Sequence, residues 1–142
     1  MRVAVLFSTI TFILGAWLST ADADVIIAGQ TIVENTTWSP SSGPYVVLGS
    51  VTVAPGVTLT VQPGTTVLFN DLVGLYVHGS LNASGATFSR SGSDRHWLGI
   101  YLAPTAGSSV LNNCIINYAG ADNYGQGLAL QPHNSVWART AL

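Results

Sequence analysis

The chain has 142 residues, enough for one folded domain, and only 7% of them are charged. Average soluble domains carry roughly 25% charged residues, and this chain contains no lysine at all. A nucleic-acid-binding surface needs clustered lysine and arginine, so the composition argues against nucleic acid as a partner. Because 48% of the residues are hydrophobic, the low charge does not indicate disorder.

Residues 1–23 have the pattern of a secretory signal peptide. A basic start at Arg2 precedes an apolar run over residues 3–18, and the sequence Ala-Asp-Ala at residues 21–23 places small residues where cleavage requires them. We predict cleavage before Asp24 and a secreted, periplasmic or cell-surface protein. The alternative is an uncleaved membrane anchor, but the run is short for a spanning helix and no basic flank follows it.

Residues 24–44 lead into the patterned part of the chain. Two short apolar runs flank Gly29, and a loop rich in serine, proline and glycine follows at residues 39–44. A stack of coils exposes an apolar cross-section at each end. We therefore expect an N-terminal cap here, with Trp38 covering the open end of the core.

Residues 45–69 form the first strongly patterned block. The sequence VTVAPG at residues 51–56 is followed by LTVQPG at residues 59–64, and each is a short strand that ends in a Pro-Gly turn. Proline fixes φ near the value that a turn needs, and glycine tolerates positive φ. Since proline has no N–H to donate to a sheet, we expect these pairs at corners and a further strand at residues 65–69.

A longer repeat begins at residue 74. The sequence GLYV at residues 74–77 returns as GIYL at residues 99–102 and as GLAL at residues 127–130. A second strand type, ATF at residues 86–88, returns as CII at residues 114–116. Repeats of 20–50 residues indicate a solenoid or array. Because the strands are short and alternate with a period of two, we predict an all-β parallel solenoid.

The repeat assigns side chains to the inside or the outside of coils that span residues 45–130, with residues 79–85 joining two strands of one coil. We expect these side chains to point inward: Leu75, Val77, Phe88, Ile100, Leu102, Ile116, Leu128 and Leu130, with Ala86 and Cys114 beside them. Two outward columns remain between them: Tyr76, Tyr101 and Ala129, and next to these His78, Ala103 and Gln131.

Cys114 is the only cysteine, so the chain forms no internal disulfide. A lone thiol is either reactive, paired between chains or buried. Its apolar neighbours Ile115 and Ile116 favour a buried side chain that acts as a small hydrophobe.

These repeating strands resemble the secreted right-handed parallel β-helix repeat proteins of bacteria. The resemblance rests on LTVQPGT at residues 59–65, LYVHGSL at 75–81, WLGIY at 97–101 and CIINYAG at 114–120, and it extends over residues 46–130. In fold, that group is similar to the pectate-lyase superfamily, which contains polysaccharide lyases and hydrolases and also surface proteins without known chemistry. The resemblance implies a right-handed β-helix but does not select an activity.

Residues 131–142 depart from the strand pattern, and we expect an irregular tail. One interpretation is a cap in which Trp137 and Leu142 cover the last coil. The other is the truncated or frame-shifted end of a longer protein. We favour truncation, because few coils bury little core and the tail shows no alternation.

Asp94 and Asp122 are the candidates for a metal site. They are 28 residues apart and therefore occupy equivalent turns of successive coils, about 5 Å apart if the coils stack directly. Calcium prefers six to eight oxygen ligands, and aspartate is common in turns for structural reasons. We therefore expect no bound cofactor, with calcium as the cation to consider.

Tyr76, His78 and Tyr101 are the candidate ligand-binding residues. An outward row of aromatic rings can lie against sugar rings, and Trp97 stands near the edge of the same coil. The alternative is that the two tyrosines only stabilise each other across neighbouring strands, as aromatic pairs do.

These observations favour a secreted or cell-surface module that binds carbohydrate or another surface without catalysis. We assign no catalytic residues, because glycoside hydrolases need paired carboxylates at set separations and acidic residues are few. The alternative is a polysaccharide lyase or hydrolase, or an N-terminal fragment of one. An ice- or crystal-binding solenoid would need a regular threonine array, for which Thr52, Thr60 and Thr66 are too few. No membrane span is expected after signal cleavage.

Overall fold

The computed structural model describes residues 23–92, 95–120, 128–130 and 136–138. Within them the chain forms short strands and one 3₁₀ turn, η1 (Pro40–Ser42). The strands are β1 (Val25–Ile27), β2 (Gln30–Ile32), β3 (Thr36–Trp38), β4 (Tyr45–Val47), β5 (Val51–Val53), β6 (Thr58–Val61), β7 (Thr66–Phe69), β8 (Gly74–Val77), β9 (Ser80–Ser84), β10 (Thr87–Arg90), β11 (Gly99–Leu102), β12 (Ser109–Asn112), β13 (Ile115–Ile116), β14 (Leu128–Leu130) and β15 (Val136–Ala138).

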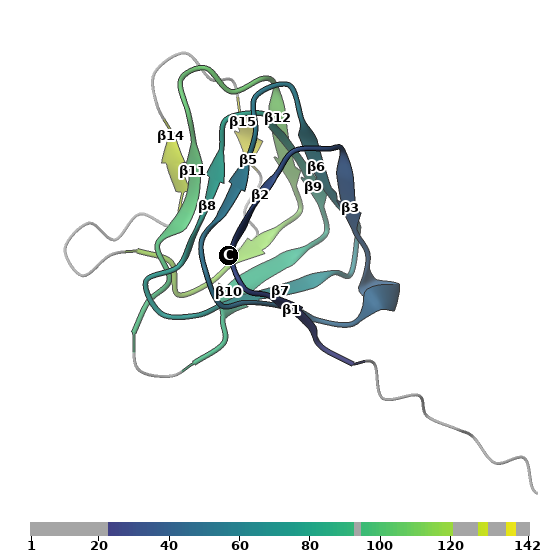
Figure 1. Cartoon of the computed structure of the whole chain (residues 1–142), viewed down its shortest axis with the longest axis vertical. Coiled ribbons are helices and arrows are strands. Elements are labelled where there is room, and N and C mark those ends of the chain that lie inside the picture. The colour runs from purple at the N-terminus through teal and green to yellow at the C-terminus, as the bar shows by residue number, and fades with distance from the viewer. Residues whose placement is uncertain (1–22, 93–94, 121–127, 131–135, 139–142) are drawn as a thin grey trace, which may run out of the picture.

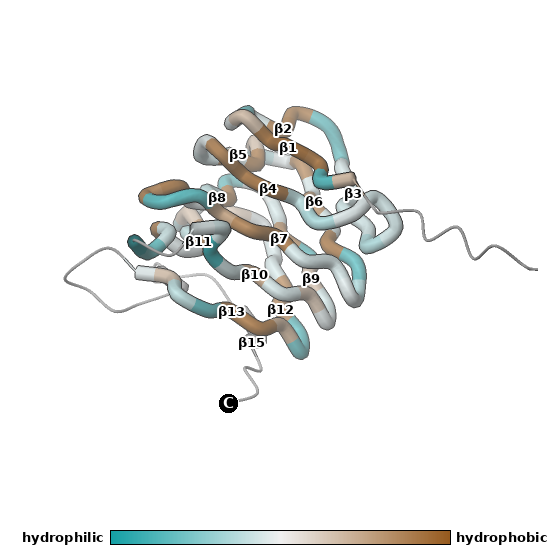
Figure 2. Tube along the Cα trace, turned by 90° about the horizontal axis from the view of Figure 1, so that it is seen from below, coloured by the Kyte–Doolittle hydropathy of each residue, from teal (hydrophilic) through white to brown (hydrophobic). Residues whose placement is uncertain are grey.

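Successive strands join three parallel sheets in turn, and each sheet has five strands. We name them sheet A (β1-β4-β7-β10-β13), sheet B (β2-β5-β8-β11-β14) and sheet C (β3-β6-β9-β12-β15). The sheets form the three sides of a triangle when viewed along the stack (Figure 1), and Figure 2 shows the strands of sheet A stacked in order. Three successive strands therefore make one coil, and the predicted parallel β-solenoid is confirmed.

The sequence repeat corresponds to the pairing of stacked strands. In sheet B, Tyr76 of β8 pairs with Tyr101 of β11, which pairs in turn with Ala129 of β14. In sheet A, Phe88 of β10 pairs with Ile116 of β13. Both registers that the repeat predicts are confirmed, so the spacing of the repeat is the length of chain in one coil.

The core fills the inside of the coils and follows from the alternation along each strand. Leu75 and Val77 of β8 and Leu102 of β11 are fully buried, whereas the side chains between them face outward. Phe69 and Trp97 stack inside, with 4.3 Å between ring centroids and 8° between ring planes. Burial of such aliphatic and aromatic side chains is the main favourable contribution to folding.

The predicted inward side chains that the structure describes lie inside the coils. Those that are buried are Leu75, Val77, Ala86, Phe88, Ile100, Leu102 and Cys114, and Ile116 is half-buried against the core. The side chains of Leu128 and Leu130 lie outside the described residues.

Cys114 is 3% exposed and is not in a disulfide. Its thiol donates a hydrogen bond to the backbone oxygen of Asn112 over 3.5 Å. The prediction of a buried cysteine that packs as a small hydrophobe is confirmed.

The Pro-Gly turns occupy corners, as the sequence predicts. Gly56 lies between β5 and β6 with φ of 76°, and Gly64 lies between β6 and β7 with φ of 82°. Both values are in the left-handed region that favours glycine.

The sequence pattern predicts residues 79–85 only as a connection between two strands. In the structure this segment contains a strand of its own, β9 of sheet C. The alternation of β8 continues through the corner, so Leu81 and Ala83 are buried while Asn82 is exposed. In the next coil the inward position beside Leu81 belongs to a polar residue, Ser109, whose Oγ accepts a hydrogen bond from the Leu81 N–H over 3.0 Å. That change of residue type hides the third strand from a search for apolar repeats.

The coils also extend further than the sequence predicts in both directions. β1, β2 and β3 pair in parallel with β4, β5 and β6, so the segment expected as a cap, 24–44, forms a coil. Trp38 of β3 is buried and stacks on Tyr45 of the next coil, with 5.0 Å between ring centroids. The segment expected as an irregular tail, 131–142, contains β15, which pairs with β12. Pairing with the neighbouring coil satisfies backbone N–H and C=O groups of these strands.

Candidate binding site

Sheet B carries two of the predicted site residues on its outer face. Tyr76 of β8 and Tyr101 of β11 point outward, because each stands between two inward residues of its strand, and both are half-buried. Their ring centroids are 6.1 Å apart and their planes are tilted by 54°. The predicted tyrosine pair therefore exists, but its rings do not form one flat platform.

The Tyr76 ring lies across the glycine that opens its own strand. A Cβ atom added to Gly74 would lie 3.2 Å from Cε2 of Tyr76 and 3.2 Å from Cβ of Leu98. A side chain at residue 74 would therefore crowd the ring. One side of the ring is thus held against the protein, and its half-exposed remainder faces solvent.

The tyrosine pair belongs to a longer outward row. Thr52 of β5 pairs with Tyr76, and Thr31 of β2 pairs with Thr52. Within the described part of the chain, no hydrogen bond occupies the hydroxyl groups of Thr31, Thr52, Tyr76 or Tyr101. The row therefore offers two aromatic rings and four free hydroxyl groups, and it carries no charge.

His78 follows β8 and is half-buried at the corner toward sheet C. Its backbone N–H donates to the Val53 oxygen over 2.9 Å, and the Ala103 N–H donates to the Val77 oxygen over 2.9 Å. These bonds place His78 and Ala103 in equivalent positions of neighbouring coils, as predicted.

The predicted exposure of Ala103 is wrong. Ala103 is only 2% exposed, because the chain turns back immediately after it, with the Ala106 N–H donating to the Ala103 oxygen over 2.9 Å. The third member of this predicted column, Gln131, lies outside the described residues. His78 is therefore the titratable member of its column, two residues along the chain from Tyr76 and just beyond the end of β8.

Trp97 does not belong to the surface. Its side chain is fully buried, and its Nε1–H donates to the Asn117 oxygen over 2.7 Å. It stacks on Phe69 in the core. The suggestion that Trp97 extends an exposed aromatic row is wrong, because its ring packs inside the coil.

The two candidate metal ligands, Asp94 and Asp122, lie outside the described residues. Among the residues that are described, no three His, Cys, Asp or Glu side chains are placed to hold a metal ion together. Asp71, between β7 and β8, is a feature that the sequence did not single out. Its Oδ1 atom is buried and lacks a hydrogen-bond partner. One carboxylate does not supply the six to eight oxygens that calcium prefers.

Charged side chains in the described strands and connections avoid the middle of every sheet face. They stand at strand ends or between strands: Asp24, Glu34, Asp71, Arg90 and Arg95. The Arg90 guanidinium lies over the ring of Tyr118, 4.2 Å from its centroid. Charges are thus concentrated at the edges, and the outer faces of the sheets are neutral.

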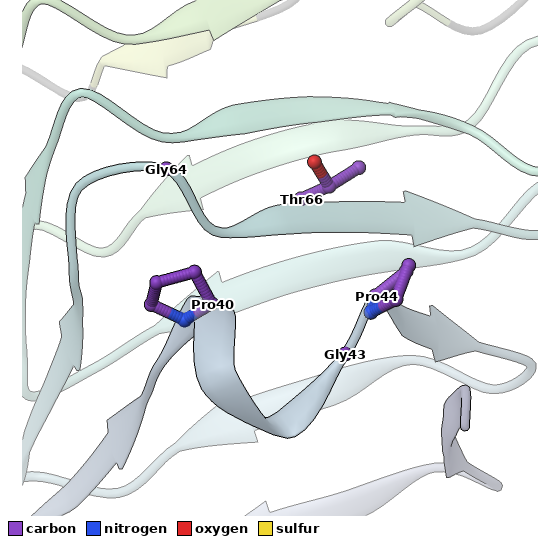
Figure 3. Close-up of a pocket in the computed structure, with 5 residues that line it drawn as sticks. All are labelled: Pro40, Gly43, Pro44, Gly64 and Thr66. Atoms are coloured by element: carbon purple, nitrogen blue, oxygen red, sulfur yellow. The ribbon is translucent and has the colours of Figure 1, made fainter. Parts of the chain in front are cut away.

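A shallow hollow of about 130 Å³ lies where η1 meets sheet A (Figure 3). Its lining consists of Pro40, Gly43, Pro44, Gly64 and Thr66. The Thr66 hydroxyl is the only polar side-chain group among these five residues, and none of them is an acid or a base. The hollow therefore lacks the groups for acid–base catalysis.

No protein-family model matches the chain, and comparisons with curated proteins and with solved structures gave no match. In the described residues, no helix has the length and apolar character that crossing a membrane requires.

Proposed function

We propose that this protein is a secreted or cell-surface module that binds carbohydrate or another polymer surface and does not catalyse a reaction on it. The observation that carries the proposal is the paired row of Tyr76 and Tyr101 on a neutral outer face, with ring centroids 6.1 Å apart. The signal-peptide pattern of residues 1–23 supports export.

The chemistry of the row matches a neutral sugar polymer. A tyrosine ring offers an apolar surface for the C–H groups of a sugar, and its hydroxyl both donates and accepts hydrogen bonds. Thr52 and Thr31 add further hydroxyl groups in the same row. An anionic polymer would instead favour arginine or lysine on the face, and the described cations, Arg90 and Arg95, stand at strand ends and connections.

The alternative proposal is a polysaccharide lyase or hydrolase, or an N-terminal fragment of one. Its specific support is Asp71, whose buried Oδ1 atom has no partner. A hydrolase pairs two carboxyl groups across the scissile bond, and the sheet B row contains none.

We also infer a right-handed winding, as in the pectate-lyase-like proteins that the sequence resembles. Each coil is a crossover between parallel strands of one sheet, and such crossovers are right-handed in about 98% of cases.

The experiment that tests the proposal incubates the secreted protein with insoluble cellulose, chitin and β-1,3-glucan and with pectate. Depletion from the supernatant measures binding, and soluble reducing or unsaturated ends measure catalysis. We expect retention on at least one neutral polymer, without product, at both low and high salt, because the face is uncharged. Release of product supports the enzyme, and absence of retention on every polymer contradicts binding.

A further inference from the structure

The outer face of sheet C carries a grid of neutral hydrogen-bonding side chains. Its central row runs through Thr37 of β3, Thr60 of β6 and Asn82 of β9, which pair in register, and it then reaches the exposed Val110 of β12. The flanking rows contain Thr58 with Ser80, and Ser84 with Asn112. The residues that alternate with them, such as Leu59 and Leu81, are buried, so the polar side chains point outward.

The grid is regular because the backbone is regular. Neighbouring strands of a sheet lie about 4.8 Å apart, and side chains on one face of a strand repeat about every 6.6–6.8 Å. Thr60 and Asn82 are therefore separated by one strand spacing, and Thr58 and Thr60 by one repeat along β6. A partner with evenly spaced hydrogen-bonding groups would meet several of these side chains at once.

These polar groups are not used to hold the fold. Within the described part of the chain, no hydrogen bond to another group involves the side chains of Thr37, Thr58, Thr60 or Asn82. Ser109, by contrast, is buried, and its Oγ accepts the Leu81 N–H. These side chains are thus available to form hydrogen bonds with an external ligand.

The outer face of sheet A shows that this composition is not general to the solenoid. Its central row is apolar and runs through Ile26, Val46 and Leu68, which pair in register. Ile26 is 55% exposed, and Figure 2 shows hydrophobic colouring along β1, β4 and β7 that fades at β10. Of the outer faces of sheets A and C, only that of sheet C carries the polar grid.

We propose that the outer face of sheet C is a second binding surface, for a neutral polymer that presents evenly spaced hydroxyl groups. The absence of charge on the grid disfavours an ionic ligand. Among the described side chains, its central row presents polar ones at Thr37, Thr60 and Asn82 and an exposed apolar one only at Val110, so the row suits a ligand that forms hydrogen bonds. The grid mixes hydroxyl and amide groups of different length, so a polysaccharide fits it better than an ice lattice, which would need identical side chains.

Each contact of this kind replaces a hydrogen bond to water and is weak by itself. Binding therefore depends on several contacts made at once along an insoluble polymer. Removing Thr60 and Asn82 together takes away two adjacent members of the central row. We expect about a tenfold loss of affinity, since two modest hydrogen bonds correspond to that factor.

The test measures depletion isotherms on microcrystalline cellulose and on chitin for the native full-length protein and for the double variant Thr60→Ala with Asn82→Ala. The matched control is Thr87→Ala with Ser89→Ala, which removes two outward polar side chains of β10 on sheet A. Thr60→Ser restores the hydroxyl and should recover part of the affinity. Thermal unfolding monitors the fold, which these outward substitutions should leave intact.

Equal retention of the Thr60/Asn82 variant and the Thr87/Ser89 control would overturn the proposal. Ice shaping by a protein that no polymer retains would overturn it as well. The grid lies on the outer face of sheet C, whereas the proposed tyrosine site lies on sheet B. Tyr76→Ala with Tyr101→Ala in the same assay therefore separates the two: full retention of that variant contradicts the tyrosine site alone.

Discussion

At Gly79 the chain passes from sheet B to sheet C with no room for a side chain. A Cβ atom there would lie 2.1 Å from the Val57 oxygen and 2.3 Å from the Ala54 oxygen. Both obstacles are backbone atoms of the neighbouring coil, so the corner would have to move. Gly56 is a useful contrast, because its φ is +76° but a Cβ would meet nothing within 4 Å.

We expect Gly79→Ala to lower the free energy of unfolding by more than about 3 kcal/mol, because the added Cβ would push against backbone atoms that cannot move aside locally. Gly56→Ala should cost only the strain of a left-handed residue, about 1–2 kcal/mol. Urea unfolding of both variants measures the difference. A smaller effect at Gly79 than at Gly56 would show that the two coils are not in the contact described.

Residue identity predicted much of the outer face but not its finer geometry. Alternation alone places Tyr76 and Tyr101 outward in one row, and the structure confirms that placement. The tilt of 54° between their rings and the position of the Tyr76 ring across Gly74 do not follow from the alternation. The burial of Ala103 likewise depends on a turn in the following connection.

Among the strands, β9 shows why the apolar repeat in the sequence did not predict the strands of sheet C. The strand has the same inward and outward alternation as β8. One of its inward columns changes from Leu59 and Leu81 to Ser109, so the apolar repeat is interrupted at β12, where Leu111 alone is apolar and buried. A search for repeated apolar residues therefore finds two of the three strand types of each coil.

The alternation in β9 gives a direct test of the strand. Leu81→Ala should destabilise the protein by about 2–5 kcal/mol, because it leaves a cavity in the core. Asn82→Ala, one residue further on, should change stability by less than about 0.5 kcal/mol, because that side chain is exposed. Chemical denaturation measures the free energy of unfolding of both variants. Similar losses of stability would mean that residues 80–84 are not a strand with one buried face.

For the whole molecule, the repeat in the sequence was sufficient to predict the fold class. Equal spacing of two strand types can be satisfied only if coils stack in register, and the three parallel sheets have that arrangement. The extent of the stack was harder to predict. β1 to β3 and β15 lack a clear sequence repeat, yet their backbones pair with the neighbouring coil, and Ile32 and Trp38 also pack in the core.

The same architecture separates three kinds of surface. Sheet A has an apolar row, sheet B has the tyrosine and threonine row, and sheet C has the polar grid. Described charges stand at strand ends or in connections, as Asp71 and Arg90 do. The proposed ligand follows from this distribution, because neutral faces with free hydroxyl groups suit a neutral polymer.

The measurement that tests the proposed function most directly compares binding isotherms on the polymer that retains the native protein. Tyr76→Ala with Tyr101→Ala should weaken retention by about tenfold or more, since loss of both rings removes the apolar surface for sugar. Tyr76→Phe with Tyr101→Phe keeps the rings and should retain most of the affinity. Tyr118→Ala removes an exposed tyrosine away from the row and should leave retention unchanged. If the double alanine variant, still folded by its thermal unfolding, binds as tightly as Tyr118→Ala, the tyrosine row is not the binding site.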